Sequence, residues 1–159
     1  MHDEHAPTAH AGLLAELSAV LTALWFEIDH RDGAEASRFF TEDADLTFSR
    51  RTFHGRSEID EVYQARAARG PRVSRHVVTN VHVRDLGPGH AESVSVLVLY
   101  AQDGEPPIAT TTPVMIADVH DRFVAVPGEK DEPRRWMIAS RRLDSCLLAP
   151  GDVLAVPTE

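Results

Sequence analysis

The sequence has one cysteine, no long apolar run and fewer positive than negative charges, and each shortage argues against a class of protein. Cys146 alone cannot form an intrachain disulfide, and the first residues lack the basic and apolar regions of a secretory signal, so we expect a cytoplasmic protein. No apolar run approaches the ~20 residues that span a bilayer. Sixteen Lys and Arg against 25 Asp and Glu give a net charge of −9, which repels phosphate and anionic lipid headgroups. We therefore expect neither nucleic acid nor membrane partners.

The remaining composition is that of one folded domain of ordinary size. Of 159 residues, 43% are hydrophobic and 26% are charged, which is far from the composition of a disordered chain. We expect one domain at residues 12–149, a flexible tail at 1–11 and a second tail at 150–159. The first tail holds three histidines, His2, His5 and His10. Zinc binding by these histidines is the weaker alternative to a solvated tail, because no Cys or carboxylate spacing accompanies them, and we expect no metal.

Apolar periodicity predicts helices in the first half of the chain. One helical stripe recurs every three or four positions and ends near residues 31–33. Its members are Leu13, Leu14, Leu17, Val20, Leu21, Leu24, Trp25 and Ile28. The short elements expected next are a helix at 34–40, a turn at 41–45 and strands at 46–48 and 52–55. Ser57 is typical of an N-cap and predicts a further helix that ends at Gly70.

The second half of the chain has the composition of β-strands. β-Branched residues are frequent in four long segments, which are separated by hairpin-sized clusters of Gly, Pro and Asp. These segments are residues 73–83, 93–100, 108–126 and 135–148. Helices at the front and antiparallel strands behind predict an α+β domain in which a curved sheet wraps against its helices.

A carboxylate stands beside the apolar stripe of the first helix. Asp29 comes one residue after Ile28 and four after Trp25, so Trp25 and Asp29 share a helical face at the edge of the stripe. A carboxylate buried without a partner is strongly destabilising. Either Asp29 is exposed at the end of the helix, or a cationic or hydrogen-bonding group meets it.

The strand expected at 73–83 carries a candidate partner, His76. One strand face would hold His76, Val78, Asn80 and His82, and the other Val77, Thr79, Val81 and Val83. On one interpretation the valine face is the core and the histidines face water. On the other, His76 and Asn80 line an internal pocket, and the valine face packs on a helix or another subunit. A neutral imidazole oriented by a carboxylate would serve as a proton shuttle near pH 7.

Six short segments follow one another in a characteristic order. They are WFEIDHRDG (25–33), FFTEDADLTF (39–48), HGRSEI (54–59), SRHVVTNVHV (74–83), HDRFV (120–124) and RWMIASRRL (135–143). In this order and spacing, the chain resembles the SnoaL-like branch of the nuclear transport factor 2-like superfamily over residues 13–148. The resemblance implies a cone-shaped α+β barrel, in which N-terminal helices close a strongly curved, mostly antiparallel sheet around one pocket. It also implies a homodimer formed through the convex sheet face.

Around its polar residues, the chain is similar to the scytalone dehydratases of that superfamily. The similarity implies that Asp29 and His76 form the catalytic pair, with the aspartate orienting the histidine. It implies a substrate pocket lined by Trp25, Phe48, Phe53, Tyr63, Asn80, Tyr100 and Met115. Where those dehydratases have the tyrosines that hold the substrate carbonyl, this sequence has Ile28 and Phe48, and their second pocket histidine has no counterpart.

These observations together predict a small cofactor-free enzyme. His76 would act as general base and Asp29 would fix its tautomer, on an apolar, aromatic or polyketide-like carbonyl compound. Dehydration, cyclisation and isomerisation each require a proton to be moved next to a carbonyl, and the sequence does not choose among them. The alternative is a non-catalytic module of the same fold that binds a small apolar ligand or supports a larger partner.

Other polar groups are expected to be structural. Arg141 and Arg142 lie on opposite faces of the last strand, and we expect an ion pair between Arg141 and Asp121. We expect Cys146 to be a small buried residue without nucleophilic function. Three acidic residues are interpreted as a loop and strand entrance without metal: Glu42, Asp43 and Asp45.

Overall fold

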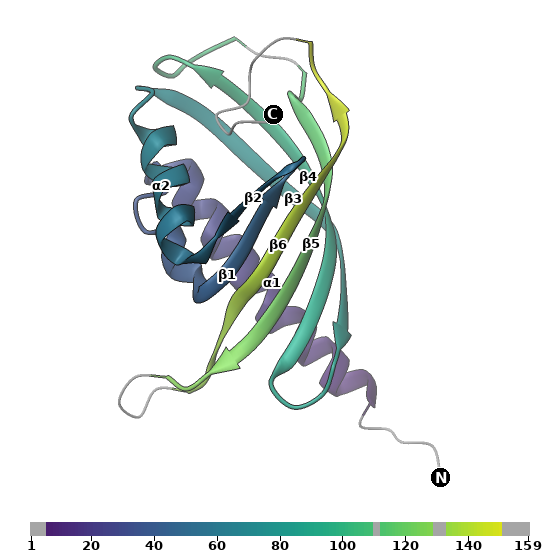
Figure 1. Cartoon of the computed structure of the whole chain (residues 1–159). Coiled ribbons are helices and arrows are strands. Elements are labelled where there is room, and N and C mark those ends of the chain that lie inside the picture. The colour runs from purple at the N-terminus through teal and green to yellow at the C-terminus, as the bar shows by residue number, and fades with distance from the viewer. Residues whose placement is uncertain (1–5, 110–111, 129–132, 151–159) are drawn as a thin grey trace.

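The structure is a computed structural model in which residues 6–109, 112–128 and 133–150 are described. Two α-helices, one 3₁₀ helix and six strands occupy these ranges (Figure 1). They are α1 (Ala6–His30), η1 (Ala36–Phe39), β1 (Phe40–Phe48), β2 (Arg51–His54), α2 (Gly55–Ala67), β3 (Arg72–Asp85), β4 (His90–Asp103), β5 (Met115–Val126) and β6 (Arg135–Leu148).

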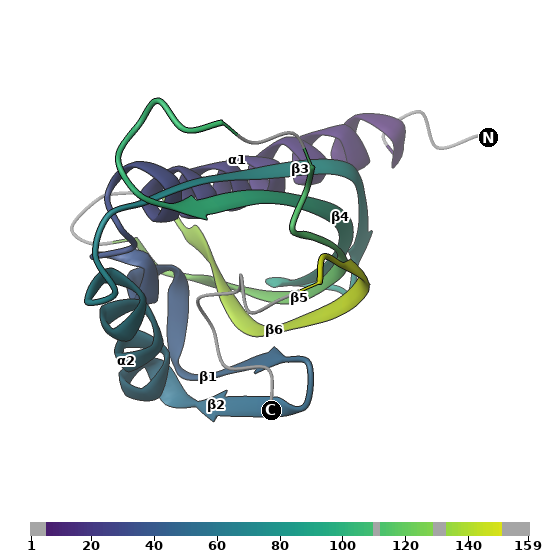
Figure 2. The same cartoon turned by 90° about the horizontal axis from the view of Figure 1, so that it is seen from above.

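The six strands form one mixed sheet in the order β2-β1-β6-β5-β4-β3. Neighbouring strands are antiparallel except for β1 and β6, which run parallel. Seen from above, the sheet bends into a trough, with α1 along β3 and α2 beside β1 on the open side (Figure 2). The predicted α+β fold with a strongly curved, mostly antiparallel sheet is confirmed, although the sheet does not close into a barrel.

Helix α1 supplies one apolar stripe to the core. Leu17, Leu21, Leu24 and Ile28 are buried, as their spacing predicts. The helix begins at Ala6, so residues 6–11, which we expected in a tail, form its first turns. The rest of that tail, with His2 and His5, and residues 151–159 of the second lie outside the described residues.

The composition of α1 also has a second interpretation. By length and hydropathy alone, Ala9–His30 would suffice to cross a membrane, although Glu16 and Glu27 interrupt its apolar residues. In this fold the stripe packs into the core, and a core helix can have the same composition.

Strand β1 is longer than its sequence predicts. The helix expected at 34–40 is a single 3₁₀ turn, and the strand already begins at Phe40, so the turn expected at 41–45 is wrong. Its acidic residues face outward while Ala44, Leu46 and Phe48 are buried, which is the alternation of a strand with one covered face. An irregular register against β6 between Phe40 and Asp45 hides this alternation at the start of the strand.

Helix α2 begins without the predicted Ser57 cap. It starts at Gly55, whose φ of +77° is a conformation that favours glycine. The carboxylate of Glu58 accepts a hydrogen bond from the backbone N–H of His54, at 2.7 Å. Glu58 therefore satisfies a backbone donor at the start of α2, as the glutamate of a capping box does, and the N-cap is His54, three residues before the predicted Ser57.

Strand β5 begins at Met115, seven residues later than predicted, because Pro113 just before it has no N–H to donate to a neighbouring strand.

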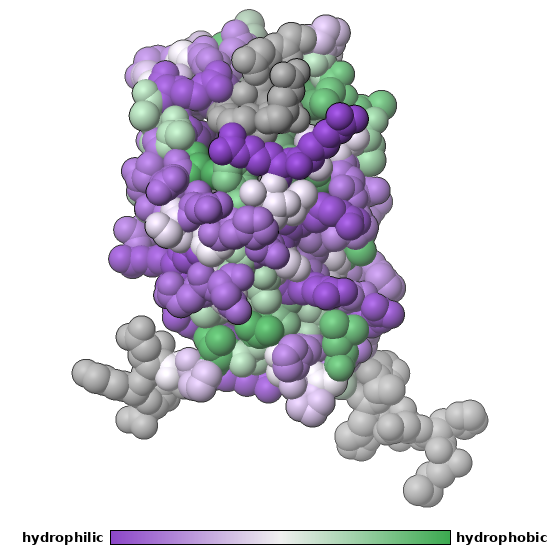
Figure 3. Space-filling view, viewed as in Figure 1, coloured by the Kyte–Doolittle hydropathy of each residue, from purple (hydrophilic) through white to green (hydrophobic). Residues whose placement is uncertain are grey.

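On the outside, the face seen in Figure 1 is hydrophilic over most of its area, and its apolar side chains form small separate groups (Figure 3). Most of the buried apolar residues lie between the inner face of the sheet and the helices, and several of them line the cavity described next.

Candidate functional site

One cavity lies between the concave face of the sheet and the two helices. It offers about 70 Å³ to the centre of a water molecule, within about 670 Å³ of unfilled space that includes its open mouth. Its walls are mostly apolar, and the polar lining residues are Tyr63, Arg66, Arg72, Ser74, His76 and Arg141. A single water requires roughly 10–15 Å³ of the smaller measure, so the enclosed part of the cavity has room for a few waters, and a larger ligand would also occupy its open mouth.

Asp29 and His76 form a close pair in this cavity. Nδ1 of His76 lies 2.6 Å from Oδ1 of Asp29, and the backbone N–H of His76 donates to Oδ2 at 2.8 Å. Both side chains are at least nine-tenths buried. The carboxylate is thus held by the backbone and by the ring of the same residue, which fixes the imidazole relative to Asp29. Of the two interpretations of Asp29, the partnered one holds.

Ser74 and Arg66 extend this pair into a hydrogen-bonded chain. The Ser74 hydroxyl donates to Oδ1 of Asp29 at 2.7 Å and accepts from Nη2 of Arg66 at 2.8 Å. Ser74 lies two residues before His76 on β3, so both side chains point to the same face of the strand. The positive charge of Arg66 therefore acts on Asp29 through a buried hydroxyl.

Trp25 packs directly on the histidine. Its ring is stacked on the His76 ring with centroids 4.3 Å apart and an interplanar angle of 13°. The guanidinium carbon of Arg141 lies 5.0 Å from the Trp25 ring centroid. Trp25 therefore restricts the orientation of His76 and links it to Arg141.

The environment holds His76 neutral and Asp29 ionised. Burial lowers the pKa of His76, Asp29 partly offsets this, and the charges of Arg66 and Arg141 lower it further, so it stays below its usual value. Burial would raise the pKa of Asp29, but the hydrogen bonds and charge of His76 and the bond from Ser74 bring it below its usual value. An ionised Asp29 accepts a hydrogen bond from the Nδ1–H group of a neutral His76. In this tautomer Nε2 carries no proton and has a free lone pair.

Arg141 and Asp121 form the predicted ion pair. Nε and Nη2 of Arg141 donate to the two carboxylate oxygens of Asp121 at 2.7 and 2.9 Å, and both side chains are buried. Burial lowers the pKa of Arg141, and Asp121 more than reverses this. Burial raises the pKa of the nearby Tyr63, so its phenol stays protonated at neutral pH.

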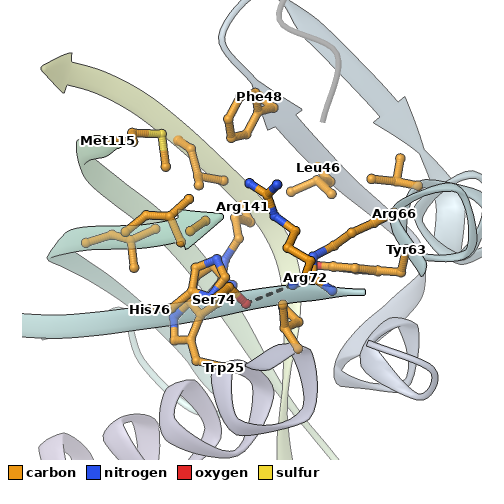
Figure 4. Close-up of a pocket in the computed structure, with 16 residues that line it drawn as sticks. Trp25, Leu46, Phe48, Tyr63, Arg66, Arg72, Ser74, His76, Met115 and Arg141 are labelled. Carbon is orange, nitrogen blue, oxygen red and sulfur yellow. Dashed lines mark hydrogen bonds between the residues drawn. The ribbon is translucent and has the colours of Figure 1, made fainter. Parts of the chain in front are cut away.

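Four of the seven predicted substrate-binding residues line the cavity: Trp25, Phe48, Tyr63 and Met115. Figure 4 shows Phe48 and Met115 at one end and Ser74, His76 and Trp25 at the other. The other three, Phe53, Asn80 and Tyr100, are not part of its lining.

The placement of Asn80 in the pocket is wrong because β3 has a bulge. The pairing with β4 shifts between Thr79 and His82, and Asn80 is exposed with a left-handed φ of +52°. The bulge exchanges the two faces of the strand. Before it His76 faces the cavity, and after it Val83 faces the core, so each of the two interpretations holds for one part of the strand.

Tyr100 and Phe53 lie outside the cavity for simpler reasons. On β4, Leu97, Leu99 and Ala101 line the cavity, so Tyr100 points to the other face of the sheet. Phe53 is buried on the edge strand β2, paired with Leu46, which lies one strand nearer the cavity. Its ring contacts the Arg51 guanidinium at 4.7 Å instead.

The sequence prediction did not include Ser74, Arg66 or Arg72 in the site. The alternation of β3 could have identified Ser74, because it shares the face of His76. Arg72 pairs with Asp103, and Arg66 reaches Ser74 from α2. Both contacts depend on the tertiary fold, so no local sequence pattern indicates them. Cys146 is exposed rather than buried, since the pairing of β5 and β6 shifts beside it.

The acidic residues Glu42, Asp43 and Asp45, for which the sequence predicts no metal, lie on β1. Glu42 is paired with Arg56, and Oδ1 of Asp45 accepts a hydrogen bond from Nδ1 of the His54 ring at 2.8 Å. Among the described residues, no group of three His, Cys, Asp or Glu side chains has the arrangement of a metal site.

Comparison with known families places the chain. The SnoaL-like domain matches residues 11–142, which is most of the sequence. The chain belongs to the SnoaL-like family. No curated protein matches it.

Solved structures with the same fold as this SnoaL-like chain are distant in sequence. The "Putative Scytalone Dehydratase" of Novosphingobium aromaticivorans DSM 12444 is 15% identical over 92% of each chain, with a TM-score of 0.75. ActVI-ORFA of Streptomyces coelicolor is 18% identical over 84% of this chain and 98% of its own, with a TM-score of 0.70. A protein from Catenulispora acidiphila in complex with S-DNPA is 20% identical over 85% and 94%, with a TM-score of 0.69. These likenesses establish the SnoaL-like fold of the chain.

Proposed function

We propose that this SnoaL-like protein is a small enzyme that moves a proton on an apolar carbonyl compound, with His76 as general base and Asp29 as its positioning group. The observation that carries the proposal is the 2.6 Å contact between His76 Nδ1 and Asp29 Oδ1 inside a mostly apolar cavity. A general base needs a free lone pair, a fixed orientation and a pKa near or below the working pH, and His76 has all three.

The proposed step uses only these side chains. Nε2 of His76 takes a proton from the carbon next to the substrate carbonyl. The C–H bond electrons form a C=C bond, and the carbonyl π electrons move onto oxygen to give an enolate. The imidazolium that forms is stabilised by ionised Asp29 and then returns the proton, either to another carbon or to a departing hydroxide, which leaves as water. Isomerisation, dehydration and carbanion-type cyclisation share the first half of this sequence, which requires no cofactor.

The walls of the cavity indicate the substrate class. Leu46, Phe48, Leu97 and Met115 offer apolar and aromatic contacts to a ligand that enters through the open mouth of the cavity. We therefore propose an aromatic or polyketide-like ketone as substrate. The putative scytalone dehydratase shares the fold, which agrees with this class of chemistry.

The experiment that tests this proposal is hydrogen exchange on a simple aromatic ketone. Phenylacetone is incubated with the protein in D₂O, and loss of its benzylic proton signal is followed by NMR. His76→Asn keeps an N–H near the Nδ1 position, which can still donate to Asp29, but has no Nε2. We expect it to reduce the protein-catalysed exchange rate by about 10²–10⁴-fold.

The matched control is His54→Asn. His54 also pairs with an aspartate through Nδ1, at 2.8 Å from Asp45, but on the exposed surface. We expect this variant to exchange phenylacetone at the wild-type rate. Equal rates in wild type and His76→Asn would show that His76 is not the base.

The second candidate is a module that binds an apolar ligand without chemistry. The apolar lining of the cavity favours it, as does the small ligand bound to the Catenulispora acidiphila protein. Binding of phenylacetone with no exchange above the buffer rate would favour this candidate over the enzyme.

We also propose that two copies pair through the outer face of the sheet. Val77, Val98, Ile116 and Leu147 are cross-strand neighbours from β3 to β6. Val77 and Leu147 are 48% and 64% exposed. Val98 and Ile116 between them are half-buried. An apolar row across four strands that is exposed at both ends is typical of a surface that a partner covers.

A further inference from the structure

One buried charged group has a hydrogen-bonding atom without a partner. Arg141 is 2% exposed, and two of its nitrogens donate to Asp121, but Nη1 is buried with no hydrogen bond in the described structure. An unsatisfied buried donor typically destabilises a protein by about 1–3 kcal/mol, and more when it is charged. Such a group in a folded protein calls for an explanation.

The position of Arg141 indicates what the missing partner is. Within the described ranges of the chain, two other buried side-chain atoms lack partners, the hydroxyls of Thr41 and Ser93, but neither residue lines the cavity, whereas Arg141 does. Arg141 also contacts Trp25, the ring stacked on His76. Figure 4 shows Arg141 on the side of the cavity that holds His76 and Ser74. A ligand in this cavity can therefore meet His76 and Arg141 together.

Asp121 gives this donor a fixed direction and a balanced charge. The two parallel hydrogen bonds hold the guanidinium plane, so the direction of the Nη1 N–H groups is set before a ligand binds. Because the carboxylate cancels the charge of the guanidinium, the pair does not require a ligand with a fixed negative charge. It suits a neutral oxygen that gains negative charge during a reaction. Arg66, by contrast, is already engaged with Ser74.

We propose that Nη1 of Arg141 binds the carbonyl oxygen of the substrate and stabilises the enolate that forms when His76 takes the neighbouring proton. This inference rests on the proposed function for the reaction, and it defines the substrate as a ketone whose oxygen reaches Arg141 while its adjacent C–H reaches His76. The C–H electron pair moves into the C=C bond, the carbonyl π pair moves onto oxygen, and that oxygen accepts hydrogen bonds from Nη1.

The test uses one variant that retains the ion pair and one that replaces it. Arg141→Lys keeps a charge for Asp121 but lacks the second terminal nitrogen. The double variant Asp121→Leu with Arg141→Met replaces the buried pair by apolar side chains, a change that folded proteins often tolerate. Arg142→Met is the control, because Arg142 is exposed on the opposite strand face and pairs with Asp144. Circular dichroism checks that each variant is folded.

The first readout is phenylacetone exchange in D₂O. Loss of one preorganised donor to an oxyanion typically reduces the rate by about 10²–10³-fold, and we expect this loss in both Arg141 variants. Arg142→Met should exchange at the wild-type rate. An Arg141→Lys protein that exchanges as fast as wild type would overturn the proposal and leave the role of His76 intact.

The second readout does not depend on catalysis. 4-Nitrophenol carries an oxygen that becomes anionic, and its two ionisation states absorb at different wavelengths. We expect excess wild-type protein to lower the apparent pKa of this phenol, and His76→Asn to retain the effect. Arg141→Lys and the double variant should lose it.

These two readouts separate the two proposals. If the wild-type protein gives no exchange but lowers the pKa of the phenol, and Arg141→Lys abolishes that shift, then His76 is not the base and Arg141 still binds the oxygen. If wild-type protein does not favour the phenolate form, or favours it equally after Arg141→Lys, the oxygen site is wrong.

Discussion

At the scale of single residues, the charge of Asp29 depends on donors that surround it. A buried carboxylate is strongly destabilising when isolated, yet Asp29 accepts from the Ser74 hydroxyl, the His76 backbone and the His76 ring. Each donor belongs to β3, so the helix residue is held by the strand it faces. The position of Ser74 is as important as that of His76, because it also satisfies Arg66.

The first prediction concerns this hydroxyl. Ser74→Ala leaves Arg66 Nη2 without its acceptor and removes one donor from Asp29, so we expect the free energy of unfolding to fall by about 1–3 kcal/mol. The control is Ser93→Ala, since Ser93 is equally buried but its hydroxyl has no partner. We expect a change close to zero for Ser93→Ala. Urea denaturation of both variants measures the difference, and equal losses would contradict the role given to Ser74.

A second prediction follows from the lowered pKa of His76. Between its folded pKa and the usual value of 6.5, the unfolded chain binds a proton on His76 that the folded chain does not. The stability from the neutral ring is therefore complete above about pH 6.5 and is lost as the pH falls through the folded pKa, with a limiting slope of about 1.4 kcal/mol per pH unit.

This pH dependence should disappear with the imidazole. We expect the free energy of unfolding of His76→Asn to fall less than that of wild type between pH 7.5 and 5.5 in urea titrations. An identical slope in wild type and His76→Asn would mean that the ring does not titrate as the structure indicates.

The sequence predicts the residue pair better than it predicts the residues around the pair. Asp29 next to an apolar stripe and His76 on a strand are both visible as local patterns. The contact from Arg66 to Ser74 depends on how α2 docks against β3, and no local pattern shows it. The unpartnered nitrogen of Arg141 is likewise a property of three-dimensional packing, although its pairing with Asp121 could be predicted.

At the scale of elements, the bulge in β3 decides which side chains reach the site. Strict alternation would place His76 and Asn80 together, but the extra residue at Asn80 turns the remainder of the strand over. Asn80 has a left-handed backbone, a conformation that asparagine tolerates better than most residues. Sequence periodicity therefore predicts the strand and His76 but not the point where the faces exchange.

A third prediction tests the bulge through its backbone conformation. Asn80→Val places a β-branched residue at a φ of +52°, and we expect it to lower the free energy of unfolding by about 1–2 kcal/mol. Asn80→Gly should be neutral or slightly stabilising, because glycine adopts this conformation without strain. Chemical denaturation of the two variants provides the comparison. A valine variant as stable as the glycine variant would show that the bulge is not where the structure places it.

At the scale of the whole molecule, the acidic surface and the apolar trough have different consequences. The net charge of −9 opposes the close approach of copies, and the face in Figure 3 is mostly hydrophilic. The outer row of Val77, Val98, Ile116 and Leu147 is a local exception that crosses four neighbouring strands, a span of about 14 Å. The four residues lie far apart in the sequence and become neighbours only through strand pairing, so the sequence alone does not indicate this row.

The last prediction is the effect of a charge placed in that row. Val77→Glu puts a carboxylate on an exposed residue at one end of the row. We expect the wild-type dimer to dissociate into monomers in this variant, as measured by sedimentation velocity over a range of protein concentrations. Phe26→Glu is the control, because Phe26 is 53% exposed on α1, away from the outer sheet face, and should leave the dimer unchanged. A stable interface usually buries about 1,200–2,000 Å², more than the row itself, so neighbouring outer residues must contribute to it as well. If wild type sediments as a monomer at all concentrations, the apolar row serves another partner or none, and the cavity must work within a single chain.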